Sequence, residues 1–234
     1  MIAAAAAAAL GILLRLLAAH GVPKHAEYAA RWDPASGGPA TAAGVLARLG
    51  LHASGAATAC EVRYYDLPAP EGAPRGAAVI LRRRVCGDGT AEIRLKYRTA
   101  RPLESWACPA GLGFSEGSEV DVGLGEEAPS RVYAYACTLA EGTPPSSLRA
   151  AAKPCAARMT RVSARAPDGG HLKVEEWTLP GGARRLEVSR TDRDDVDALA
   201  AFQRVVERLE AAGARFLAES KTELGSRCPE AGAR

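Results

Sequence analysis

Charged and apolar residues alternate between Ile80 and Arg98, in two runs separated by the turn residues 87–89. Side chains that alternate with a period of two point to opposite faces of a β-strand, so this stretch predicts a β-hairpin with one apolar and one charged face. Most of the charged residues are cations. A folded protein needs a physical reason to gather so many like charges on one small surface.

The register of the hairpin decides which cations share a face. The predicted register places Arg82 opposite Lys96 and Arg84 opposite Arg94, whereas a slip by one residue would mix charged and apolar side chains on each face. It gathers five cations on one surface: Arg82, Arg84, Arg94, Lys96 and Arg98. Directly opposed like charges are destabilising, so we expect an anionic partner, either carboxylates across a cavity or a bound polyanion. The alternative is an outer face on which water separates the charges.

Alternating segments recur along the chain and are separated by turns rich in glycine and proline. They cover residues 25–32, 60–67, 118–124 and 130–139, and the stretch 155–191 divides into three further strands at the turns PDGG and PGG. A last short strand is expected at 218–226. The spacing of apolar residues predicts a short helix at 41–50, with Thr41 as its N-cap, and a long helix at 194–213.

Acidic residues also alternate with apolar ones on several of these segments, among them Glu119, Asp121, Glu175 and Glu187. Charges of both signs on many strands favour a sheet closed into a barrel with a charged interior. An open sheet whose polar face meets water is the alternative. The predicted fold class is α+β: a single domain built on an antiparallel eight-stranded tunnel-like β-barrel, with a short N-terminal and a long C-terminal helix packed outside.

Residues 1–26 are predicted to be a signal peptide or leader, because a long Ala- and Leu-rich run opens the chain. Cleavage fits before Val22 or before Glu27. An uncleaved amphipathic or membrane anchor is the alternative, which Arg15 within the apolar run disfavours. The folded domain is expected at 27–228 and a tail at 229–234, with no transmembrane anchor after leader removal and a secreted or periplasmic location.

The six cysteines agree with export. They are scattered along the chain without the close spacing of a zinc site, and in an oxidising compartment they would form three disulfides. Symmetric pairing of the strands at 60–65 and 80–86 around their loop places Cys60 directly opposite Cys86, which predicts a disulfide between them. A more distant partner for Cys60, such as Cys228, stays open, because connectivity does not follow from sequence alone.

Composition and motifs exclude several classes of protein. A content of 47% hydrophobic residues is enough for a buried core, and a net charge of +3 gives no indication of specific nucleic-acid recognition. The chain contains neither a P-loop nor the glycine pattern of a dinucleotide-binding fold, and its four histidines suggest no Ser-His-Asp or Cys-His arrangement. The oligomeric state is left open.

The stretch 64–98 resembles the core of the CYTH superfamily, the triphosphate tunnel metalloenzymes. The family's tyrosine-rich strand ending in Asp is similar to Tyr64-Tyr65-Asp66, its LRxR strand to residues 81–84, and its LxxK strand to the IRLK stretch ending at Lys96. Later family strands resemble SEVDV at 118–122, MTR at 159–161, RLEVS at 185–189 and the Ser220-Lys221 pair. The resemblance covers residues 27–225.

The resemblance implies a tunnel in which basic side chains hold a triphosphate or polyphosphate and carboxylates hold Mg²⁺ or Mn²⁺. The implied phosphate ligands are Arg31, Arg82, Arg84, Arg94, Lys96, Arg161 and Lys221. The implied metal ligands are Glu27, Glu119, Asp121 and Glu187. Arginine forks match phosphate oxygens, and a metal neutralises the charge that develops in phosphoryl transfer. An anionic phosphate-containing ligand would therefore account for the cationic hairpin.

Two carboxylates of the family pattern are missing here. The first strand's ExExK signature reads EYAAR at 27–31, and the late EIE-like strand reads EVS at 187–189, so Ala29 and Ser189 replace acids. Their loss should weaken metal binding more than phosphate binding. The prediction is an exported CYTH-like protein that binds a phosphate-rich polyanion, with weak metal-dependent phosphohydrolase activity if it is active; no catalytic residue is assigned. The alternative is a non-catalytic structural or ligand-binding envelope protein with a solvated charged face.

Overall fold

The computed structural model describes residues 23–109, 111–125, 129–140 and 142–229. Most of the predicted leader, residues 1–22, and the end of the predicted tail, residues 230–234, lie outside the described residues. Within the described residues, no helix combines the length and the apolar character needed to cross a bilayer.

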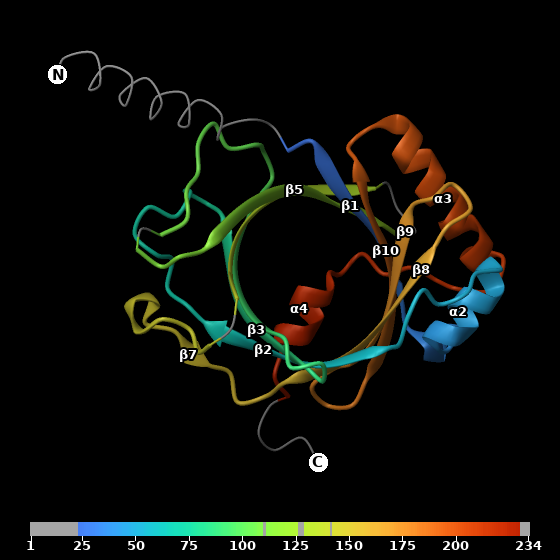
Figure 1. Cartoon of the computed structure of the whole chain (residues 1–234), viewed down its shortest axis with the longest axis horizontal. Coiled ribbons are helices and arrows are strands. Elements are labelled where there is room, and N and C mark those ends of the chain that lie inside the picture. Colours follow the sequence, from blue (N-terminus) through green and yellow to red (C-terminus); the bar gives the residue numbers. More distant parts are fainter. Residues whose placement is uncertain (1–22, 110, 126–128, 141, 230–234) are drawn as a thin grey trace.

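The described residues form ten strands, three α-helices and two 3₁₀ turns (Figure 1). The strands are β1 (His25–Trp32), β2 (Thr58–Asp66), β3 (Ala78–Cys86), β4 (Ala91–Thr99), β5 (Ser115–Leu124), β6 (Ser130–Ala140), β7 (Ala151–Ala152), β8 (Ala157–Arg165), β9 (His171–Thr178) and β10 (Arg184–Arg193). The α-helices are α2 (Ala42–Leu49), α3 (Val196–Glu210) and α4 (Lys221–Ser226), and the 3₁₀ turns are η1 (Pro34–Ser36) and η2 (Ser146–Leu148).

The sheet closes into a barrel, as predicted. Its strands follow the order β3-β4-β6-β5-β1-β10-β9-β8-β2, and β2 pairs with β3 to complete the ring, while the two-residue β7 pairs only with β2. The prediction of eight antiparallel strands is wrong in two respects, because nine strands form the ring and β1 runs parallel to β5. The two differences have one cause: strand direction cannot alternate all the way around a closed ring with an odd number of strands.

The predicted hairpin is β3 and β4, with a register shifted by two residues from the prediction. Arg82 pairs with Arg94 and Arg84 with Glu92, because the three-residue turn is centred on Asp88, one residue earlier than the predicted register requires. The Cys86 N–H donates to the Thr90 carbonyl at 2.8 Å, and Gly89 takes the positive φ of 85° that ends such a three-residue loop. A shift of two leaves every side chain on its predicted face.

Helices α2 and α3 begin and end close to the predicted positions and pack outside the barrel (Figure 1). The Thr41 hydroxyl accepts a hydrogen bond from the Gly44 N–H and so caps α2, while the Asp195 carboxylate caps α3. Buried Phe202 of α3 packs against buried Tyr28 and Leu186 of the barrel wall, within the largest apolar core. The wall of β8, β9, β10 and β1 is therefore covered on its outer face.

The predicted strand at 218–226 is wrong, because residues 221–226 form helix α4. Ser220 and Glu223 make a capping box, in which each side chain accepts a hydrogen bond from the other residue's backbone N–H. The helix lies inside the barrel (Figure 1). Its Leu224 joins the apolar cluster of Val62 and Tyr64 at one end of the interior, which leaves the other end polar.

All six cysteines are paired. Cys60 and Cys86 are directly opposed on β2 and β3 and form the predicted disulfide, with Cα atoms 3.9 Å apart. The other two disulfides join Cys108 to Cys137 and Cys155 to Cys228. The last of these links the residue two positions beyond α4 to the segment that leads into β8, so the helix is tethered to the barrel wall.

Candidate anion-binding site

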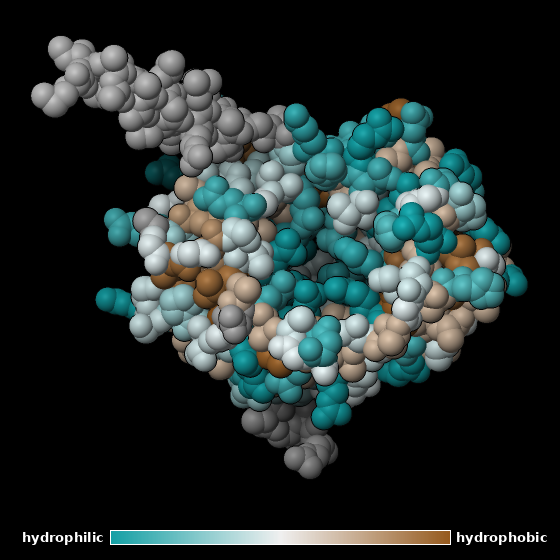
Figure 2. Space-filling view, viewed as in Figure 1, coloured by the Kyte–Doolittle hydropathy of each residue, from teal (hydrophilic) through white to brown (hydrophobic). Residues whose placement is uncertain are grey.

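A cavity of about 610 Å³ occupies the polar end of the barrel interior. In the space-filling view the hollow at the centre of the barrel is surrounded by hydrophilic residues (Figure 2). Its cationic lining residues are Arg31, Arg82, Arg84, Arg94, Lys96, Arg98, Arg131, Arg161, Lys173 and Lys221. All seven side chains predicted to hold phosphate are among them. The hairpin cations thus face the interior of a closed barrel, and the predicted alternative of a solvated outer face does not apply.

Three lining cations are additional to the predicted site. Arg98 lies one strand period beyond Lys96, so the alternation that identified its neighbours also placed it on the same face. Lys173 lies two residues before Glu175, and strand alternation alone would have included it. Arg131 pairs at 2.7 Å with Asp194, a residue near the start of α3 that strand alternation could not connect to it.

The first group of contacts lies on the hairpin. Arg82 and Arg84 share the Glu92 carboxylate, at 3.3 Å and 2.9 Å respectively. Arg82 is directly opposite Arg94 in the strand pair, and the Nε–H groups of both are buried without a hydrogen-bond partner in the described structure. A buried donor without an acceptor is costly, and here it adds to the repulsion of two facing cations. Glu92 contacts Arg82 on one side of the arginine pair, and this single carboxylate does not offset both the missing hydrogen bonds and the repulsion.

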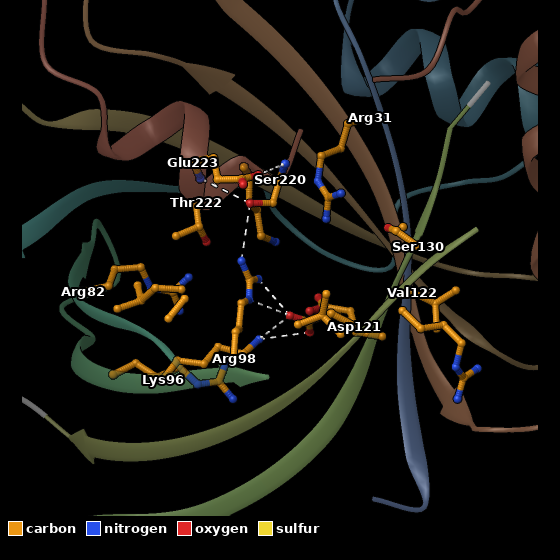
Figure 3. A pocket seen from close by; sticks show the side chains of 18 of the residues that line it. Arg31, Arg82, Lys96, Arg98, Asp121, Val122, Ser130, Ser220, Thr222 and Glu223 are labelled. Atoms are coloured by element: carbon orange, nitrogen blue, oxygen red, sulfur yellow. Dashed lines mark hydrogen bonds and ion pairs between the residues drawn. The ribbon is translucent and has the colours of Figure 1, made fainter. Parts of the chain in front are cut away.

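A group of three carboxylates lies where β1 runs beside β5. Glu27 is paired in register with Asp121, and oxygen atoms of Glu27, Glu119 and Asp121 lie within 4.8 Å of one another. The Lys96 ammonium lies 3.0 Å from Glu119 and 3.0 Å from Asp121. Arg98 also contacts Asp121, at 2.8 Å, and Figure 3 shows Lys96 and Arg98 both directed at Asp121. These contacts give the acids a cationic neighbour on the hairpin side of the cavity.

The Glu27 carboxyl is ionised at neutral pH. Its burial alone would raise its pKa, but the ammonium groups of Lys221 and Lys96 lower that pKa to about 2. Three carboxylate groups close together are the kind of oxygen ligand set that Mg²⁺ and Mn²⁺ prefer. The donor chemistry therefore fits a divalent cation, held by three of the four predicted metal ligands.

Glu187, the fourth predicted metal ligand, lies in a different group. Its buried carboxylate pairs with Arg31 at 2.5 Å and with Lys221 at 2.6 Å. Beside it, the equally buried Glu175 accepts hydrogen bonds from Arg161 and from Lys221, at 2.6 Å and 3.1 Å. Both acids are thereby engaged in holding the three cations Arg31, Arg161 and Lys221 at the cavity wall.

Ion pairing fixes the charge states in this second group. Burial would raise the pKa of the Glu175 carboxyl, but Lys221 and Arg161 hold it well below its usual range. Burial would lower the pKa of the Lys221 ammonium, but Glu175 and Glu187 raise it above its usual value. Lys221 is the first residue of α4 and lines the cavity, so the helix contributes a permanent cation to it.

The two positions that lack family acids lie side by side. Ala29 pairs in register with Ser189, and both are almost fully buried, at 2% and 1% exposure. Neither side chain offers the anionic oxygen that a divalent cation requires. Within the described ranges, the grouped carboxylates that could hold a metal lie in the β1–β5 corner.

Comparison with known proteins concerns the fold. No protein-family model and no curated protein matches this chain. Among solved structures, one match is the putative adenylyl cyclase HpAC1 from Hippeastrum, which is described as having a dominant triphosphatase activity. Its TM-score is 0.52 at 12% identity, and the match covers 88% of this chain and 98% of that protein. The PH1819 protein from Pyrococcus horikoshii OT3 matches with a TM-score of 0.46 and 14% identity, over 85% and 97%.

These observations define the class of protein as a closed tunnel-like β-barrel with a strongly basic interior. At 12% identity, the likeness to the Hippeastrum protein concerns the fold alone. The three disulfides fit an oxidising compartment such as the periplasm or the cell exterior.

Proposed function

We propose that the barrel binds a phosphate-rich polyanion, a triphosphate or polyphosphate, in its basic cavity. The observation that carries the proposal is the facing pair Arg82 and Arg94, whose buried Nε–H groups have no acceptor among the described residues. A phosphate oxygen placed between them would accept both hydrogen bonds and remove the repulsion of the two guanidinium groups. Charge-assisted bonds of this kind are about twice as strong as neutral ones.

The remaining predicted phosphate ligands would surround the same polyanion. Arg31, Arg161 and Lys221 are held at the wall by Glu175 and Glu187, so their geometry is set before the ligand arrives. Such preorganisation reduces the cost of ordering side chains on binding. Arg84 pairs with Glu92, and Lys96 pairs with Glu119 and Asp121; both cations would share their charge with the ligand.

A second candidate function is metal-dependent phosphohydrolysis, which the grouping of Glu27, Glu119 and Asp121 favours. These three carboxylates would hold Mg²⁺ or Mn²⁺, which when bound neutralises phosphate charge and lowers the pKa of a coordinated water. Ala29 and Ser189 supply no further acid, so we expect slow turnover. Export to the periplasm or the exterior belongs to the same proposal, supported by the disulfides.

The test is calorimetric titration of the oxidised protein with tripolyphosphate at low salt. We expect binding that weakens steeply with added salt, and a loss of affinity of at least about 100-fold in Arg82→Gln/Arg94→Gln, because two charge-assisted contacts disappear. Phosphate release with Mg²⁺ or Mn²⁺, assayed on the same samples, tests the second candidate.

The matched control is Arg83→Gln. Arg83 lies between the two cavity arginines Arg82 and Arg84 on β3, but its Nε donates to the Gly142 carbonyl outside the barrel at 3.0 Å. This variant should bind like the wild type. Wild-type protein that releases no heat with tripolyphosphate at low salt would leave the structural, non-binding alternative.

A further inference from the structure

Lys173 is a cavity cation that makes no ion pair among the described residues, although its charge interacts with that of the Glu27 carboxylate. It lies on β9 and lines the cavity, yet within the described parts of the chain no carboxylate oxygen lies within 4.0 Å of its ammonium. Arg94 is the other cation lining the cavity that has no carboxylate oxygen within 4.0 Å among the described residues. Every remaining cation around the cavity has at least one such partner, for example Arg31 with Glu187.

The surroundings of Lys173 explain why it has no partner. Its strand neighbour in register is Ser189, and the next residue in the same row is Ala29. On its other side Ser163 is the register partner. A row of small neutral side chains leaves space beside the ammonium, and none of them offers the charge that a lysine inside a barrel requires.

Lys173 and Arg94 lie on opposite sides of the ring. Between β4 and β9 there are three strands in one direction, β3, β2 and β8, and four in the other, β6, β5, β1 and β10. The two uncompensated cations therefore face each other across the cavity rather than forming one cluster. A single compact anion can neutralise one of them, whereas an extended anion can contact both.

We propose that Lys173 directly binds one anionic group of the ligand, while the Arg82–Arg94 pair binds another across the cavity. This inference rests on the proposed function and deepens it: the ligand is a linear polyanion with at least two separated anionic groups. Because Ala29 and Ser189 provide no metal ligand beside Lys173, this contact does not use a divalent cation.

The experiment titrates the full oxidised chain with tripolyphosphate and with orthophosphate, both in excess chelator. In Lys173→Gln we expect tripolyphosphate affinity to fall about 10-fold or more, from the loss of one charge-assisted contact, and orthophosphate affinity to change little. Lys153→Gln is the matched control, because Lys153 pairs with Asp66 and does not line the cavity. It should leave both affinities unchanged.

A second variant adds the missing acid. In Ser189→Asp a carboxylate would stand directly beside Lys173 and pair with it, so tripolyphosphate affinity in chelator should fall as in Lys173→Gln. A near-ultraviolet circular dichroism spectrum like that of the wild type confirms that each variant is folded.

The outcomes separate this inference from the function on which it rests. If the wild type does not bind tripolyphosphate at all, the proposed function fails. If the wild type binds and Lys173→Gln binds equally well, or if the chelator abolishes wild-type binding, only the role of Lys173 is overturned. Equal losses for orthophosphate and tripolyphosphate would also overturn it, since they would place both anionic groups at one site.

Discussion

Glu175 is the residue on which the electrostatics of the barrel interior depend most. Its carboxylate is 1% exposed and accepts hydrogen bonds from Arg161, from Lys221 and from the indole of Trp177. Strands β8 and β9 and helix α4 therefore meet at one buried charge. Removing one member of such a network leaves the other charges buried without compensation. The free-energy cost of that removal exceeds the net stabilisation that the intact network provides.

Stability should consequently depend on pH through Glu175. Its pKa is lowered by folding, so its ionised form stabilises the folded state above the usual value of 4.5, and this contribution is lost as the pH falls below 4.5. We expect urea unfolding free energies that are level near neutral pH and decrease in acid. Glu175→Gln should be less stable by about 3 kcal/mol at pH 7 and should show a shallower acid decrease. An identical acid decrease in the variant would contradict this assignment.

Among the elements, the hairpin was predictable and α4 was not. The period of two fixed the face of Arg82, Arg84 and Lys96 even though the register was shifted by two residues, because side-chain direction repeats with that period. In the stretch 218–226 alternation suggested a strand, but the Ser220–Glu223 capping box is a local helix signal that outweighs a few alternating residues. Its position inside the barrel depends on distant residues such as Val62, so no local pattern could indicate it.

The Cys155–Cys228 disulfide, which tethers α4 to the barrel wall, should stabilise the fold and protect this helix. Replacing both partners, in Cys155→Ser/Cys228→Ser, removes a link across 73 residues and should lower the free energy of unfolding by about 2–4 kcal/mol. Amide hydrogen exchange should accelerate in α4, because the helix then loses its covalent link to the wall and is held by noncovalent contacts such as those of Lys221 and Leu224. The control is Cys108→Ser/Cys137→Ser, which should leave exchange in α4 unchanged. Unaltered protection of α4 in the first variant would show that the disulfide does not hold the helix.

At the scale of the whole molecule, charges of both signs on many strands favoured a closed barrel over an open sheet, and the structure has the closed barrel. The number of strands and the parallel pair did not follow from this pattern, because β1 and β5 are separated by three strands and a helix along the chain. That pairing brings Glu27 beside Asp121, whereas Glu187 lies with Arg31 instead. Which residues share a charged group is thus decided by the pairing register of strands that are far apart in the chain. A single sequence does not reveal that register.

The three disulfides also have an order along the chain: first with second, third with fourth, and fifth with sixth cysteine. A chain that crosses a membrane from its N-terminus would present each cysteine to its native partner before the next pair emerges. Oxidation at first encounter would then give the native connectivity, so maturation should not require an isomerase to reshuffle wrong bonds. Peptide mapping of protein oxidised during synthesis in an isomerase-free extract would test this; abundant non-native pairs would refute it.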